Sequence, residues 1–329
     1  MAALTKHSKH SRKTITTRGL VRIGGLALLI AICLWVGQID RVARAVAIAP
    51  ELSAGVSSLD YAQGQAGFAD VAGAYPLTVS ISLDGKPLDV FWGGEDYWAL
   101  FAFSLDTPPG EHTLQIEAVN PVDGTSLRQT YPLKVHATSF PTDDVDVSPI
   151  LVPLLDPKLN QQETDELAAI YSVTTHPTTF PWPFAMPVED ATIVSSFGDY
   201  RIYNGGMLTS RHTGVDLRRR LGDPVLATAA GRVAAAQPFK IHGNAIVIDH
   251  GYGVYSLYAH LAGFLVKPGE WVQQGQEIGL AGFTGRATGP HLHFEIIING
   301  MSVDPIRWLA LSPYFVPPKI DSSALAPGM

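Results

Sequence analysis

Two short motifs in the C-terminal half of the chain contain histidines and an aspartate that could form one site. His212–Asp216 has the form His-x-x-x-Asp, and His291–His293 has the form His-x-His, with His260 between them. Alternate side chains of a strand share a face, so residues spaced two or four apart can converge on one ion. Gly214 argues against a helix in the first motif. Two imidazoles and one carboxylate are typical of hydrolytic zinc sites, where water completes the coordination.

The motifs belong to an ordered series of short sequences between Phe184 and Trp308. The series comprises His212–Asp216, Gly222–Ala227, Gly231–Val233, Gly243–Asn244, Ile248–Gly251, Tyr258–Leu261, Val272–Gly279 and Thr288–Glu295. As a set it resembles the M23 family of zinc metallopeptidases, the lysostaphin/LytM-like peptidoglycan endopeptidases. The resemblance implies a compact antiparallel β-sandwich with a metal site in a groove.

Carried over position by position, the resemblance implies one zinc ion per chain, held by His212, Asp216 and His293. The family's two catalytic histidines that are not ligands correspond to His260 and His291, implied to serve proton transfer and oxyanion stabilisation. Bound zinc lowers the pKa of a water molecule to about 7 and polarises a carbonyl. The implied reaction is hydrolysis of peptide bonds in peptidoglycan stem peptides or cross-bridges.

Two other classes of protein stay open. Some family members have lost ligands, and a non-catalytic envelope protein of this kind would bind wall peptides or activate another cell-wall hydrolase; here none of the five positions is substituted. Val266–Gln276 resembles the turn of biotinyl/lipoyl carriers and sugar-phosphotransferase phosphocarriers. The complete ligand set opposes the carrier interpretation. So do residues 1–45, which have the pattern of an export segment.

Charge is distributed unevenly along the 329 residues. Residues 1–45 hold eight of the 23 Lys and Arg and one of the 30 Asp and Glu, which leaves 15 bases and 29 acids, a net charge of −14, on residues 46–329. Nucleic-acid affinity rests on neutralising phosphates, so we expect no nucleic-acid partner. The only cysteine, Cys33, lies in the apolar N-terminal stretch, so the remainder has no disulfides.

Residues 1–45 combine a basic leader with the apolar run Ile23–Gly37, which fits a signal peptide or a short membrane anchor. Ala43–Ala45 has the A-x-A form of a cleavage site, and cleavage there would give a secreted enzyme. The long leader and the charges before Ala45 favour an anchor over residues 20–39. The positive-inside rule then predicts a single-pass cell-membrane protein with a cytoplasmic basic tail and an extracytoplasmic catalytic domain.

Residues 56–137 have the pattern of an all-β module. Leu77–Leu83 alternates with period two and runs into the turn signal Asp84–Gly85, and Tyr97–Phe103 reads as a buried strand. Short strands separated by Gly/Pro turns predict an antiparallel sandwich that resembles bacterial immunoglobulin-like modules. We expect this module to fold independently and to be dispensable for cleavage of a soluble peptide.

Residues 138–183 form a Pro-rich connector, interpreted as a stiff spacer. Within it, Asn160–Tyr171 predicts a short helix with Asn160 as N-cap and Glu163 as its capping-box partner. We assign residues 184–312 to the catalytic domain and 313–329 to a tail, in a mainly β protein. An aromatic cluster is predicted to pack on the edge of the catalytic domain or, alternatively, to line the substrate groove: Phe180, Trp182 and Phe184.

Other polar residues of the catalytic domain have weaker cases. Glu295 shares the face of the His-x-His motif by parity and is either a groove-wall or a surface carboxylate. Asp249 and His250 face opposite ways, and either is a candidate hydrogen-bond partner of a ligand. The remaining histidines are isolated in sequence and predicted to be solvated: His112, His136, His176 and His242.

Overall fold

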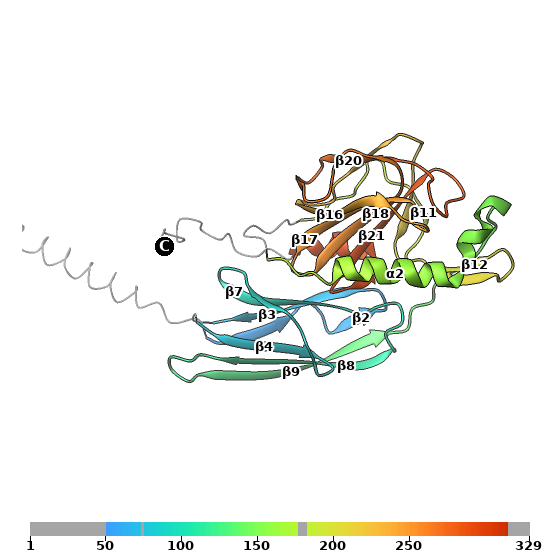
Figure 1. Cartoon of the computed structure of the whole chain (residues 1–329). Coiled ribbons are helices and arrows are strands. Elements are labelled where there is room, and N and C mark those ends of the chain that lie inside the picture. Colours follow the sequence, from blue (N-terminus) through green and yellow to red (C-terminus); the bar gives the residue numbers. More distant parts are fainter. Residues whose placement is uncertain (1–50, 74–75, 177–182, 315–329) are drawn as a thin grey trace, which may run out of the picture. The chain divides into compact units, whose positions relative to one another are not determined.

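The computed structural model describes residues 51–73, 76–176 and 183–314, which belong to one compact unit of the chain (Figure 1). The predicted anchor over residues 20–39 lies outside the described residues. So do Phe180, Trp182 and the tail beyond residue 314. Within the described ranges, no helix is both long and apolar enough to cross a membrane.

The N-terminal module consists of two sheets with an apolar core between them. One sheet has the order β1 (Ser53–Val56), β3 (Ala66–Ala72), β7 (Asp96–Ala102), β6 (Val90–Trp92). The other has the order β2 (Asp60–Ala62), β9 (Ser126–His136), β8 (Gly110–Val119), β4 (Thr78–Leu83), β5 (Lys86–Pro87). In β8, Leu114 and Ile116 are buried while Gln115 and Glu117 are exposed, as period-two alternation predicts.

The sheets of this module differ from the prediction in one respect. β2 pairs with β9 in parallel, so the sandwich is not purely antiparallel. The outer face of the first sheet also packs on the catalytic domain, where Phe91 and Tyr252 have ring centroids 4.2 Å apart. Asn299 Nδ2 donates to Leu100 O at 2.9 Å. Independent folding and the immunoglobulin-like assignment stay predictions.

The catalytic domain is built on a ten-stranded sheet whose strand pairs are all antiparallel. Its main path is β11 (Ile193–Ser195), β14 (Val215–Arg218), β21 (His291–Ile298), β18 (Val254–Phe264), β17 (Asn244–Gly251), β16 (Gly231–Pro238), β19 (Trp271–Val272) (Figure 1). Three further strands complete this sheet: β15 (Pro224–Leu226), β20 (Glu277–Ala281) and β22 (Met301–Val303). Two short helices follow β22: α3 (Pro305–Leu311) and η2 (Ser312–Tyr314). Phe184 is buried in the core of this domain.

The spacer interpretation of the connector is wrong for residues 142–171. β10 (Thr142–Val145) pairs in parallel with β12 (Tyr200–Tyr203), which pairs with β13 (Leu208–Arg211). The short helix η1 (Pro149–Leu155) leads into α2 (Pro157–Tyr171). Leu167 of α2 packs against buried residues of β16, β17 and β18, so the helix belongs to the catalytic domain (Figure 1).

The N-cap predicted for this helix is also wrong. α2 begins at Pro157, and the Asp156 side chain caps it by accepting a hydrogen bond from the Lys158 backbone N–H at 2.9 Å. Proline is favoured at the first helical position because it has no N–H to leave unpaired. Glu163 is therefore free of a capping role and points to other partners.

Candidate metal centre

Neighbouring strands bring the two motifs together. β14 and β21 pair so that Asp216 lies directly opposite His293, and His212 lies in the segment between β13 and β14. His212 Nε2 lies 3.0 Å from His293 Nδ1 and 3.1 Å from Asp216 Oδ1, and His293 Nδ1 lies 3.0 Å from the same oxygen. All three side chains are buried. His212, Asp216 and His293, here called the three-residue cluster, thus lie together in the structure.

Glycine is required at position 214 for this approach. A Cβ atom there would lie 2.3 Å from Phe294 O of the facing strand. Any side chain would therefore push β14 away from β21 and separate the donor atoms of the three-residue cluster.

The far side of each ligand ring is held by a hydrogen-bond acceptor. His212 Nδ1 donates to Ser196 O at 2.8 Å, which leaves a lone pair on Nε2 in the neutral ring. His293 Nε2 lies 2.8 Å from Glu295 Oε1, so Nδ1 is the nitrogen that faces the cluster. Tetrahedral zinc with bonds near 2.0–2.1 Å separates its nitrogen and oxygen ligands by roughly 3.3 Å. Donor atoms 3.0–3.1 Å apart therefore fit a divalent cation.

The charge states of the cluster also suit a cation. Burial raises the pKa of Asp216, but His212 and His293 lower it well below its ordinary value. Burial lowers the pKa of His212, although Asp216 opposes the shift. Asp216 is therefore an ionised carboxylate and His212 a neutral imidazole, the forms that bind metal. Burial lowers the pKa of His293, but Asp216 and Glu295 raise it above its ordinary value, so a metal ion would displace a proton from this ring.

Arg201 contacts the three-residue cluster, and no sequence motif predicted this contact. From β12, its Nη2 donates to Asp216 Oδ2 and, at 2.8 Å, to Ser195 Oγ. One oxygen of Asp216 is thereby held, and Oδ1 is left to face the two histidines. A single arginine in a short strand carries no sequence signal for this role.

The two predicted catalytic histidines border the three-residue cluster. His260 Nδ1 donates to Thr284 O and His291 Nδ1 donates to Gly289 O, each at 2.8 Å, which leaves both Nε2 atoms unclaimed by these bonds. The His260 and His291 rings have centroids 4.8 Å apart, and His291 Nε2 lies 3.6 Å from Asp216 Oδ1. Burial, followed by the nearby His291 and His293, lowers the pKa of His260 well below its ordinary value.

His260 also has a strained backbone, with φ of 62°. A non-glycine residue in this left-handed region costs about 1–3 kcal/mol, and such strain is concentrated at functional sites. The backbone N–H of His260 donates to His242 O at 2.8 Å, which helps to hold this conformation.

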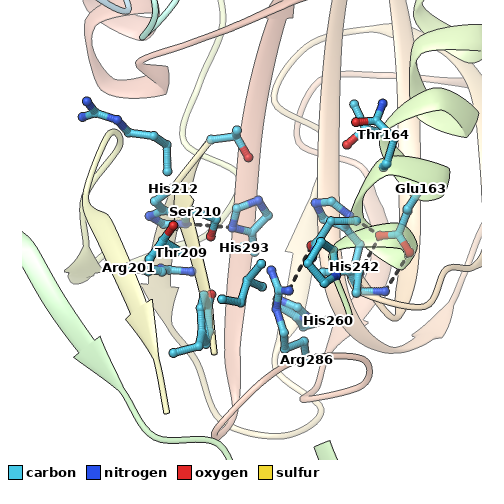
Figure 2. Close-up of a pocket in the computed structure, with 18 residues that line it drawn as sticks. Glu163, Thr164, Arg201, Thr209, Ser210, His212, His242, His260, Arg286 and His293 are labelled. Atoms are coloured by element: carbon cyan, nitrogen blue, oxygen red, sulfur yellow. Dashed lines mark hydrogen bonds and ion pairs between the residues drawn. The ribbon is translucent and has the colours of Figure 1, made fainter. Parts of the chain in front are cut away.

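Two cavities open onto the site. One, of about 380 Å³, is lined by His212, His260 and His293 and by Asn160, Glu163 and Thr164 of α2 (Figure 2). The other, of about 540 Å³, is lined by Asp216, His291 and residues 143–146. Arg201, Tyr203, His260 and Arg286 line both, and the Arg286 guanidinium lies 4.7 Å from the Tyr203 ring centroid. The two cavities therefore share part of their lining, and each borders members of the three-residue cluster.

The other polar candidates divide into those that reach the site and those that do not. Glu295 is buried and contacts His293, so the surface alternative is wrong. His250 instead contacts Ala230 O and Ser256, and Asp249 accepts from Thr175, so neither reaches a ligand. Burial lowers the pKa of His250 to about 4.

Of the histidines predicted to be solvated, His136 and His176 are exposed. His112 is only partly exposed and lies 2.6 Å from Asp84. The prediction is wrong for His242, which lies between Glu163 and Glu295. The partners of His242 come from distant parts of the chain, and no local sequence signal indicates them.

This donor set, bordered by two cavities, is of the kind that metallohydrolases use to hold zinc. The sequence profile of Peptidase family M23 matches residues 210–305, so the chain carries an M23 peptidase domain.

The curated relatives match this chain over little more than one third of its length. Peptidoglycan DD-endopeptidase ShyA of Vibrio cholerae is 39% identical over 122 residues, which are 37% of this chain and 28% of that protein. DD-carboxypeptidase/endopeptidase Mpg of Neisseria meningitidis is 42% identical over 120 residues, 36% of this chain and 27% of that protein. The chain thus spans less than a third of the length of these curated relatives.

A solved structure extends the similarity beyond the matched domain. A putative peptidase M23 from Pseudomonas aeruginosa superimposes with a TM-score of 0.53 and 25% identity, covering 75% of this chain and 94% of that one. The fold shared with that protein therefore includes residues outside the range 210–305.

Proposed function

We propose that this protein is an exported zinc-dependent endopeptidase that hydrolyses peptide bonds in peptidoglycan stem peptides or cross-bridges. The observation that carries the proposal is the convergence of His212, Asp216 and His293, with donor atoms 3.0–3.1 Å apart, beside two cavities. The M23 match supports the reaction, and relatives named peptidoglycan DD-endopeptidases support the substrate class.

The three-residue cluster would hold the zinc ion. When bound, zinc supplies a Lewis acid and a water molecule whose pKa is about 7. Arg201 holds Asp216 in place, and the carbonyl of Ser196 holds the His212 ring. These contacts keep the donor atoms together before the ion binds, which reduces the ordering that binding requires.

His260 and His291 would handle protons and developing charge. Each ring is oriented by a hydrogen bond from Nδ1 to a backbone carbonyl, which leaves Nε2 available beside the cavities. A neutral imidazole can take a proton and later give it to the leaving amine, and an N–H at Nε2 can stabilise an oxyanion. Either histidine could take either role.

Digestion of purified, cross-linked peptidoglycan tests this function. We expect new amino and carboxyl termini within the peptides, identified by mass spectrometry of the released fragments, and intact glycan strands. Sugar cleavage would contradict the proposal. Intact peptides from several wall chemistries, with zinc bound, would favour the alternative of a non-catalytic protein that binds wall peptides or activates another hydrolase.

We further propose that residues 20–39 anchor the protein in the cell membrane with the catalytic domain outside the cytoplasm. The support is the basic leader before an apolar run, with charged residues between that run and Ala45. N-terminal sequencing of the mature protein should find a start at Met1 or Ala2. A start at Val46 would mean a secreted enzyme without an anchor.

A further inference from the structure

A carboxylate of α2 is buried against the catalytic domain. Glu163 is 5% exposed and lies upstream of the matched residues 210–305. Its Oε2 accepts from the Ile241 backbone N–H at 2.7 Å, and its Oε1 accepts from the His242 backbone N–H at 2.9 Å. Oε1 also lies 2.6 Å from His242 Nδ1 (Figure 2). Three contacts to two consecutive residues fix both the His242 backbone and its ring.

The far side of the His242 ring leads to the three-residue cluster. His242 Nε2 lies 3.4 Å from Glu295 Oε1, and that same oxygen lies 2.8 Å from His293 Nε2. Thr213 Oγ1 and Ser302 Oγ donate to the two Glu295 oxygens at 2.6 and 3.1 Å. Glu163, His242, Glu295 and His293 therefore form a continuous chain, here called the relay, that ends at a ligand nitrogen.

The charges along the relay are complementary. The His242 ring lies between two buried carboxylates, with Nδ1 2.6 Å from Glu163 Oε1 and Nε2 3.4 Å from Glu295 Oε1. A cation between two buried carboxylates offsets their mutual repulsion, which would otherwise be costly at low dielectric. Removing the charge of Glu163 would therefore disturb the contact between His242 and Glu295.

We propose that Glu163 is a positioning residue of the metal centre: it fixes His242, which holds Glu295 in the orientation that aims His293 at the metal. This inference rests on the proposed zinc site. Carboxylates that orient a ligand histidine are generally worth 10- to 100-fold in metal affinity or activity. Glu163 acts one step further out, so we expect about tenfold, the lower end of that range.

The test is zinc affinity in the full chain, measured by competition with a chromophoric chelator. Glu163→Gln should bind zinc about tenfold more weakly than wild type. Glu166→Gln is the matched control, since Glu166 lies on the same helix, is exposed, and contacts only Gln237, at 2.8 Å, among the described hydrogen bonds. It should bind zinc within about twofold of wild type.

A double-mutant cycle separates positioning from general loss of structure. If Glu163 acts through Glu295, adding Glu163→Gln to Glu295→Gln should weaken zinc binding less than about twofold further. An undiminished tenfold effect in that background would overturn the relay, as would wild-type zinc affinity in Glu163→Gln.

The remaining outcomes are also decisive. Should Glu163→Gln unfold in the zinc-free form, His242→Gln carries the same test, with the same expected loss and the same expected coupling to Glu295→Gln. Absence of zinc binding by the wild type would overturn the proposed metal site and this inference together. Zinc binding by the wild type with unchanged binding by Glu163→Gln would overturn this inference alone.

Discussion

Replacement of His293 by alanine is expected to lower the zinc content from about one ion per chain to near zero after dialysis. The change removes one of three donor atoms that lie 3.0–3.1 Å apart, and two protein ligands rarely hold zinc. It also leaves Glu295 without its contact to the ligand ring. Because the proposed chemistry depends on the ion, hydrolysis should be lost together with the metal. Elemental analysis of the dialysed protein gives the stoichiometry.

The matched control is His136→Ala. His136 is exposed, lies in β9 of the N-terminal module and contacts Asp60 at 2.8 Å, away from both cavities. This variant should keep one zinc ion per chain and wild-type activity. A wild-type zinc content in His293→Ala would remove His293 from the ligand set.

His260→Ala and His291→Ala are expected to keep zinc and fold yet lose about 10² to 10⁴ in turnover, the usual worth of a proton-transfer group. Neither ring belongs to the three-residue cluster, so the donor atoms stay in place without them. The measurement pairs zinc content with the rate of cleavage of a soluble cross-linked peptide. The loss should appear mainly in kcat, because these groups act on charge that develops during the reaction.

Either variant cleaving at near wild-type rate would show that its histidine is not catalytic here. A variant that loses zinc as well as activity would instead show that the histidine contributes to zinc binding. The His136→Ala protein again provides the reference rate, so a general effect of losing one histidine is controlled.

The sequence predicted those parts of the fold and site that depend on local pattern. Alternation along Leu77–Leu83 predicted β4, and the resemblance to the M23 family implied that His293 and Asp216 share a site. In the structure, β14 and β21 pair with Asp216 opposite His293, and side chains opposite each other on antiparallel strands are neighbours.

The parts that sequence analysis missed depend on contacts between distant segments. Arg201 reaches Asp216 from a strand with no motif of its own. Glu163 has the spacing of a capping partner for Asn160, but its carboxylate instead binds Ile241 and His242. Prolines in residues 138–183 suggested a spacer, although proline equally fits the first turn of a helix such as α2. Local pattern carries no signal for the contacts of Arg201 and Glu163, because their partners lie elsewhere in the chain.

The central claim is zinc-dependent peptide hydrolysis, and the digestion experiment tests it most directly when it is run as a zinc titration. Wild-type protein stripped by a chelator is returned to zinc in steps, and fragments of one cross-linked wall peptide are measured by mass spectrometry. We expect no cleavage without zinc and full activity at one equivalent per chain. Undiminished cleavage by the stripped protein, or no cleavage at one equivalent, would contradict it.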